Sequence, residues 1–479
     1  MRGIIHRTAA VAGGLLAAAL LAPGAAVAHG VQGRAETPIP IEAFFWAAAL
    51  VLVVSFVGLA VGWSSPRLEG TRLRRAPRRL EAVALSPVTV WTLRLLVLAG
   101  FLLVAAVAAV GSTRLGSNLA PLVVFVVWWV GLVPLSVVFG NVWREVNPWS
   151  TIARIGRFHA TRADRPVPAW VGVWPAAAVL LAFGWFELVY PTPAEPRLLA
   201  VLIAVYTVAT LAGMWRFGRE AWVDHGEAFS VYTRLLALLS PVELREEGGV
   251  RRLYFRPPFV SVTRIRTQPG IVAVVAVLIA TVTYDGLSAT GFWARRDVAA
   301  SERLIDVGLS DFQAGVLIGS FGLLGSLAVF SIGYELCSAV SGRLARWRYT
   351  SVGRVAVAFA HSLVPIAFAY FVAHYFTLFV FQSQDLIRLV SDPFGSGADL
   401  FGTANRQIDF QLVSAEAIWA VQVAAIVIGH VLGLAFAHDR ALQLGRTHRE
   451  ALTSQGPFLL LMVALTVAGL WSLSAGMGA

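Results

Sequence analysis

The sequence contains no lysine, a single cysteine and few charged residues, and each shortage limits what the protein can be. Charged residues make up 14% of the 479 residues and hydrophobic residues 57%, whereas soluble domains carry about 25% charged residues. The lone Cys337 excludes an internal disulfide and a cysteine-based metal cluster. The chain has no P-loop, HExxH or GxSxG motif, so ATP-driven transport, zincin proteolysis and serine-elbow hydrolysis have no support.

The hydrophobic residues lie in runs of about 20, the length that a helix needs to cross the hydrocarbon core of a bilayer. The pattern therefore predicts an all-α protein, a polytopic transmembrane helix bundle with about ten spans. We expect the spans at 41–63, 88–110, 119–140, 170–190, 198–217, 270–285, 311–334, 355–381, 415–437 and 456–475.

Residues 1–28 have the features of a cleavable secretory signal peptide. Arg2 and Arg7 form a basic start, an apolar stretch follows, and Ala26-Val27-Ala28 fits the small-x-small cleavage pattern. Cleavage would leave His29 as the new N-terminus of a single transmembrane domain, 29–479. The alternative is an uncleaved first span.

The arginines predict the orientation of the spans. With the mature N-terminus and the C-terminus outside, the predicted inner loops hold 27 arginines and the outer segments hold 8. This ratio agrees with the positive-inside rule for a multi-pass protein of the plasma membrane. The formal charge of +11 is therefore explained by topology, and we expect the lipid bilayer, and no nucleic acid, as a partner.

Three segments of the predicted inner face look structured. Asn147-Pro148-Trp149-Ser150 and Glu227-Ala228-Phe229-Ser230 begin two stretches that read as amphipathic helices in the inner membrane interface. Their similarity indicates either an internal duplication or coincidence. The segment 240–269, with paired arginines and prolines, is where we expect a cytoplasmic hairpin.

The span at 355–381 is unusual because it carries two histidines and a proline. His374 and Asp385 are 11 residues apart, so they share one face if the helix continues. His361 points about 220° away from His374, and Pro365 predicts a kink beside it. We therefore expect His374 to belong to an outer-half site and His361 to an inner one, where it either bonds to a neighbouring helix or handles protons.

Three more carboxylates accompany His374 on the predicted outer half, and they are Glu187, Asp285 and Glu416. Ionisable groups inside spans are costly and mark functional sites. We take the three as candidate catalytic residues, ligands or bases. The alternative is that each one faces water at a membrane end.

His29, His374 and Asp385 form the candidate metal site. An N-terminal histidine chelates through its amine and its ring, and imidazole with carboxylate suits a divalent metal such as Zn, Cu or Fe. The long segment 391–410 on the same side mixes turn residues with Phe394 and Phe401, so we expect it to pack over the bundle.

Several motifs resemble those of an actinobacterial family of polytopic membrane proteins named fenitrothion hydrolase. They are AHG at 28–30, NPWSTIARIG at 147–156, TYDGL at 283–287, SDPFGSGADLFGT at 391–403 and GHVLGLAFAHDRAL at 429–442. The resemblance extends over the whole mature chain. It implies a hydrolase that cleaves the P–O–aryl bond of organophosphate esters, and it supplies no catalytic residues.

Three functions are compatible with these residues. The first is a membrane hydrolase with a metal-assisted water at the outer face, acting on a small-molecule substrate. The second is a transporter or metal-handling permease. The third is a structural or assembly protein whose polar groups serve only packing.

Overall fold

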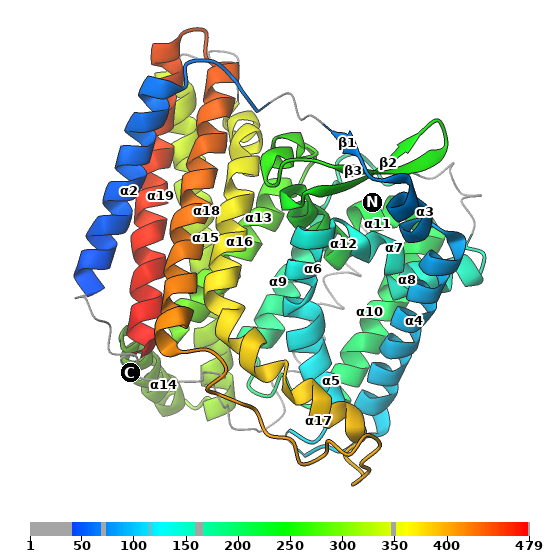
Figure 1. Ribbon diagram of the computed structural model, residues 1–479. Helices are drawn as coiled ribbons and strands as arrows, with labels where there is room; N and C mark the ends of the chain where they lie inside the picture. The colour runs from blue at the N-terminus through cyan, green and yellow to red at the C-terminus, as the bar shows by residue number, and fades with distance from the viewer. Residues whose placement is uncertain (1–40, 69–72, 115, 159–165, 346–350, 478–479) are drawn as a thin grey trace.

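The computed structural model describes residues 41–477 apart from 69–72, 115, 159–165 and 346–350, and the predicted signal peptide and His29 lie outside that part of the chain. The described chain is an all-α helix bundle (Figure 1), as predicted. Nine of its helices are long and apolar enough to cross a membrane, and the shorter apolar α9, Trp174–Leu188, matches the tenth predicted span. We conclude that the chain is a multi-pass integral membrane protein.

Most predicted spans agree closely with the helices. The long unbroken ones are α2 Ile41–Gly62, α4 Pro87–Val110, α10 Pro196–Phe217, α13 Ile271–Ser288, α15 Asp311–Leu344, α16 Val352–Gln382, α18 Ala415–Leu444 and α19 His448–Met477. The span predicted at 270–285 has 16 residues, whereas the helix α13 has 18. The third span is divided into α5 Leu119–Leu122, the π-helix η1 Val123–Val130 and α6 Leu132–Phe139.

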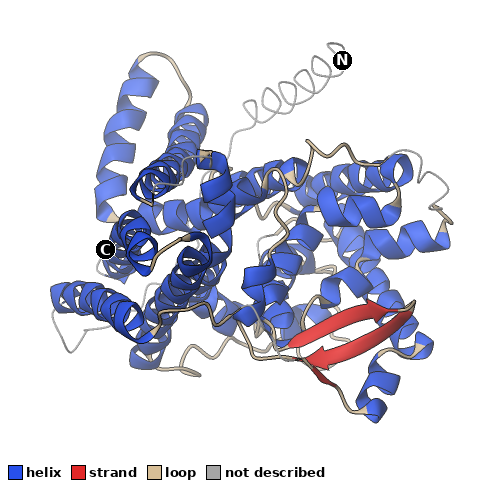
Figure 2. Ribbon diagram, turned by 90° about the horizontal axis from the view of Figure 1, so that it is seen from above, coloured by secondary structure: helices blue, strands red, loops and turns tan. Residues whose placement is uncertain are grey.

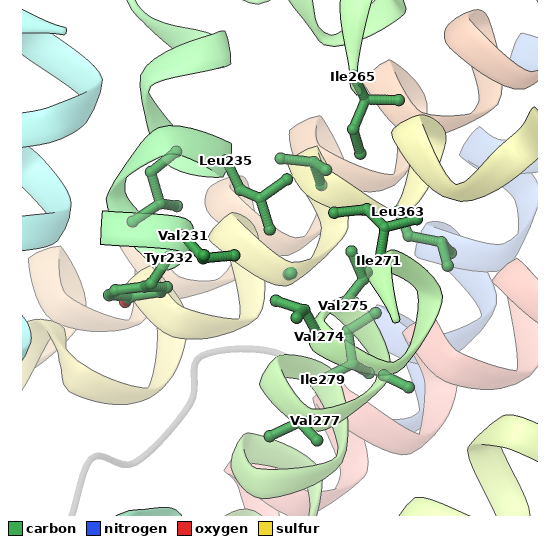
Figure 3. Packing of buried hydrophobic residues seen from close by; sticks show 14 of the residues in the cluster. Val231, Tyr232, Leu235, Ile265, Ile271, Val274, Val275, Val277, Ile279 and Leu363 are labelled. Atoms are coloured by element: carbon green, nitrogen blue, oxygen red, sulfur yellow. The ribbon is translucent and has the colours of Figure 1, made fainter. Parts of the chain in front are cut away.

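The helices form two groups that pack side by side (Figure 1). One group contains α2, α13, α15, α16, α18 and α19, and the other contains α4, α10 and the divided third span. The groups meet where α9 packs along α13 and η1 packs against α16. Figure 3 shows the hydrophobic core where α12 (Ala228–Leu236), α13 and α16 come together, with Tyr232, Val274 and Leu363 in one cluster.

Where the structure describes them, the predicted inner loops and outer segments lie at opposite ends of the bundle. One end, here called the sheet end, carries a three-stranded antiparallel sheet in the order β1-β3-β2 (Figure 2). The other, the loop end, carries α14 (Gly291–Asp306), α17 (Asp385–Ser391) and the segment 392–414. The alternation of loops is thus as predicted, and the assignment of the sheet end to the cytoplasm stays a prediction.

The hairpin expected within 240–269 is present. It consists of β2 Val242–Glu247 and β3 Val250–Phe255, joined by two glycines. Gly248 and Gly249 both have positive φ, at 58° and 77°, which is the backbone conformation that a two-residue hairpin turn requires. The strand β1, Arg74–Arg75, pairs with β3 and was not predicted.

Glu81 of α3 (Arg78–Ala84) connects this sheet to the helices. Its carboxylate accepts hydrogen bonds from Arg75 of β1 at 2.7 Å and from the Leu253 amide of β3 at 3.1 Å, and Arg252 lies 3.2 Å away. The Arg75 hydrogen bond, followed by the Leu253 amide, lowers the pKa of Glu81 to about 2. The carboxylate therefore remains charged in the folded protein at pH values where an unfolded glutamate would be protonated.

This lowered pKa predicts a pH dependence for the sheet. Because the folded pKa lies below the unfolded one, the stabilisation by Glu81 is complete above about pH 4.5 and is lost as the pH falls towards 2. We expect the protection factor of the Leu253 amide in hydrogen exchange to fall between pH 5 and pH 3. In Glu81→Gln protection should be weaker at pH 5 and should change little over that range. Equal pH responses in the two proteins would exclude this role.

The two stretches predicted as interfacial helices are helices, but they are buried instead of lying at a surface. They are α8 Pro148–Ile155 and α12, and their caps Asn147 and Glu227 are both fully buried. The amide of Asn147 donates to Glu227 at 2.8 Å, so the two helix starts meet. Each is preceded by a glycine with positive φ and a short helix, α7 Val142–Val146 or α11 Arg219–His225. This repeated order of elements favours the internal duplication.

Candidate functional site

Asp285 and His374 form a direct pair between two membrane spans. The His374 Nε2 atom lies 2.6 Å from Asp285 Oδ2, and each side chain is about a quarter exposed, 23% and 24%. Asp285 is in the last turn of α13, and His374 lies two turns before the end of α16. A short imidazole–carboxylate contact inside an apolar bundle makes this pair the leading candidate for a functional site.

The apolar surroundings hold the pair in place. α16 is the most buried of the long apolar helices that the structure describes, because it packs against α13, α15 and α18 at once. α13 buries Val282 and Tyr284, close to Asp285 in the same helix. The backbone of both helices is thus fixed by packing, and the two polar side chains need no further partner to meet.

Glu187 lies near the pair, on the helix that joins the two groups. It is in the last turn of α9, close enough to Asp285 and Tyr375 to interact with both electrostatically. Tyr375 directly follows His374 in α16, and their rings are 4.9 Å apart. The structure therefore brings together three of the predicted site residues, Glu187, Asp285 and His374.

An aromatic cluster borders this site on the side of α9. Trp129 of η1 stacks on Tyr232 at 5.1 Å and lies 5.9 Å from Phe371, which lies 4.6 Å from Tyr375. Tyr375, Tyr232 and Trp129 were not predicted from the sequence. The position of Tyr375 next to a histidine within a span was an available signal, whereas the contributions of α12 and η1 depend on tertiary packing.

A small pocket lies on another side of His374. It is lined by Val282, Tyr370, Ala373, His374, Ile426, Gly469 and Ser472, from α13, α16, α18 and α19. It has room for about one water molecule. His374 thus contacts a carboxylate and also lines a space of the size of a water molecule.

Asp385 does not contact His374. The prediction assumed one continuous helix, but α16 ends at Gln382 and a two-residue turn precedes α17, which begins at Asp385. Asp385 forms an ion pair with Arg388, with N···O distances of 2.6 and 2.7 Å, whereas His374 pairs with Asp285. Arg388 also donates to the carbonyl of Gly116 at 2.6 Å, so this pair anchors the loop end.

Glu416 is also separate from the site, because its side chain is exposed in the first turn of α18. His29 lies outside the described residues. Among the residues that the structure describes, no group of three or more His, Cys, Asp or Glu side chains is placed to hold a metal ion. His374 and Asp385 thus do not form a ligand pair, and the divalent metal stays a prediction that depends on His29.

The inner histidine belongs to a different environment, as its angle on the helix predicted. His361 is fully buried, with its ring nitrogens 3.0 Å from the Ala358 carbonyl and 3.3 Å from the Phe436 carbonyl of α18. It therefore bonds to a neighbouring helix, which was one of the two predicted alternatives. α16 continues through Pro365 without interruption.

Compared with protein-family models, curated proteins and solved structures, the chain has no match. The site must therefore be interpreted from its own geometry.

Proposed function

We propose that the protein is a proton-coupled membrane transporter in which Asp285, His374 and Glu187 form the proton-exchange site. The observation that carries the proposal is the 2.6 Å contact between Asp285 of α13 and His374 of α16. Imidazole changes its charge near neutral pH, and a neighbouring carboxylate couples that change to the contact between the two helices. Protonation of the site thereby alters the attraction between α13 and α16.

The position of the site supports transport. In secondary transporters, binding sites lie where two groups of helices meet, beside spans that are interrupted. Here Glu187 comes from α9 and Asp285 from α13, the two helices that join the groups. Trp129 of η1 belongs to the aromatic cluster that borders the site. π-Helical segments inside helices are frequent at functional sites.

The transport proposal is tested by electrical recording from reconstituted protein. Proteoliposomes on a solid-supported membrane would be exposed to small organic anions, organic cations, divalent metals and aryl phosphotriesters, each at pH 6 and pH 8. We expect a solute-induced current for one class that grows with an imposed proton gradient. The proposal would be contradicted if flux driven by the proton gradient persisted in His374→Gln. It would also be contradicted if correctly oriented, folded protein gave no current with any of the solute classes.

A hydrolase is the second candidate, supported by the water-sized pocket beside His374 and by the family resemblance of the sequence motifs. In this mechanism His374 removes a proton from a water in the pocket and Asp285 orients the ring. The water oxygen attacks phosphorus, and the aryl oxygen leaves with the electron pair of the P–O bond. Release of the aryl alcohol from a dialkyl aryl phosphate by wild type, and not by His374→Gln, would favour this candidate over transport.

A further inference from the structure

The sheet end contains a cluster in which arginines outnumber the acidic residues that pair with them. The cluster is made of Arg94, Arg144, Arg154, Arg219, Arg234, Arg251 and Arg266, with Glu145, Glu220 and Asp224 among them. Seven guanidinium groups against three carboxylates leave a net charge of +4. Such a cluster attracts an anion.

Every carboxylate in the cluster is shared by two or three arginines. Glu145 accepts from Arg94 at 3.2 Å and lies 2.8 Å from Arg251. Glu220 forms ion pairs with Arg144 at 2.9 Å and with Arg154 at 3.6 Å. It also forms one with Arg219. Because the acids are shared, they cannot neutralise each arginine, and the cluster keeps a net positive charge.

Arg154 is the least compensated member. Within the described part of the chain its ion pair is the long 3.6 Å contact to Glu220, and its side chain is partly buried in the last turn of α8. Burial and repulsion from Arg219 and Arg94 lower the pKa of Arg154 to about 10. An anion held near Arg154, Arg219 and Arg94 would relieve this repulsion.

The surroundings of the cluster are apolar and exposed. Trp91 of α4 lies 5.4 Å from the Arg94 guanidinium and is 40% exposed. Ile155 follows Arg154 at the end of α8 and is 56% exposed. α8 packs against α4, and Arg94 lies seven residues inside α4, roughly 10 Å below its start. Charge and apolar surface therefore meet at membrane depth.

We propose that Arg154 and Arg219 bind the phosphate headgroup of an anionic phospholipid, whose acyl chains lie along Trp91 and Ile155. Arg94 is buried and bonded to Glu145, so it adds its positive charge to the site without touching the headgroup. The net positive charge selects an anionic headgroup over a zwitterionic one. The exposed apolar side chains select a lipid over a free phosphate ion. Basic pockets between spans recognise anionic lipids in this way.

The proposal is tested by lipid-dependent thermal unfolding of the purified protein, with native mass spectrometry as a second readout. Phosphatidylglycerol should raise the unfolding midpoint more than phosphatidylcholine or inorganic phosphate does. Arg154→Gln and Arg219→Gln should each weaken phosphatidylglycerol retention by about fivefold, the effect of one cationic side chain near an anionic membrane surface.

The matched control is Arg79→Gln, which removes the same charge from an exposed position on α3 at the same end. It should retain phosphatidylglycerol as wild type does, and Arg154→Lys should retain most of it. If Arg154→Gln does not fold, the proposal is tested by Arg219→Gln and by comparing phosphatidylglycerol with phosphatidylcholine on the wild-type protein. Equal stabilisation by phosphatidylglycerol and phosphatidylcholine, equal stabilisation by inorganic phosphate, or an equal loss in Arg79→Gln would overturn the proposal.

Discussion

Asp285→Asn should lower proton-coupled transport by at least about 100-fold, the lower limit of what a positioned acid–base group contributes to a proton-transfer step. Asparagine has nearly the same shape as aspartate and its oxygen can still accept a hydrogen bond from His374. It cannot take up a proton or stabilise a charged imidazole. The protein should therefore fold and insert normally while the coupling of α13 to α16 is lost.

Infrared difference spectra between pH 5 and pH 8 measure the same site without a solute. We expect protonation bands in wild-type protein in lipid that change in Asp285→Asn and in His374→Gln. Flux measurements on the solute class found by recording then give the loss of transport. Size-exclusion profiles and unfolding midpoints establish that the variants are folded.

Asp385→Asn is the matched control because it makes the same chemical change in another carboxylate near the loop end. Asp385 is paired with Arg388 and has no contact with His374. Loss of a half-buried ion pair that lies outside the site has a small effect, so transport should stay within about twofold of wild type. Wild-type flux in Asp285→Asn, or an equal loss in Asp385→Asn, would show that the His374–Asp285 contact serves packing alone.

The spans were predictable because lipid imposes a length and a composition on each helix. The apolar runs located α2, α4, α10 and α16 within a few residues, and they located the start of α18. The breaks were harder to predict. The turn between α16 and α17 occurs at Ser383-Gln384, which no proline or glycine marks, and it removed Asp385 from the predicted site.

The site was predictable only as a set of candidates. Depth along the chain grouped Glu187, Asp285 and His374, and these three lie near one another in the structure because all lie towards the same end of the bundle. Which carboxylate reaches His374 depends on how α13 and α9 rotate against α16, and rotation is determined by packing. Glu416 has the same depth, but it begins a helix whose first turn is exposed.

The motif GHVLGLAFAHDRAL also has a structural explanation in the contact between α16 and α18. Gly429 and Gly433 are one helical turn apart and face α16. A Cβ atom on Gly429 would overlap the Cβ of Ala369 and lie 2.9 Å from the Pro365 carbonyl oxygen. A Cβ atom on Gly433 would lie 2.7 Å from the Ser362 carbonyl oxygen. Small residues at this spacing allow two membrane helices to approach closely.

Gly429→Ala should therefore destabilise the protein by about 1–3 kcal/mol, the usual cost of overpacking a close contact. The gain in helix propensity from glycine to alanine, about 1 kcal/mol, acts in the opposite direction and is outweighed because backbone and Cβ atoms cannot move aside. Gly325→Ala in α15 is the control, since nothing lies within 4 Å of its added Cβ, and it should be neutral or slightly stabilising. Unfolding midpoints in one detergent compare the two. Because α16 also carries His374, Gly429→Ala should weaken transport as well. Equal unfolding midpoints for Gly429→Ala and Gly325→Ala would show that α16 and α18 can move apart without loss of stability.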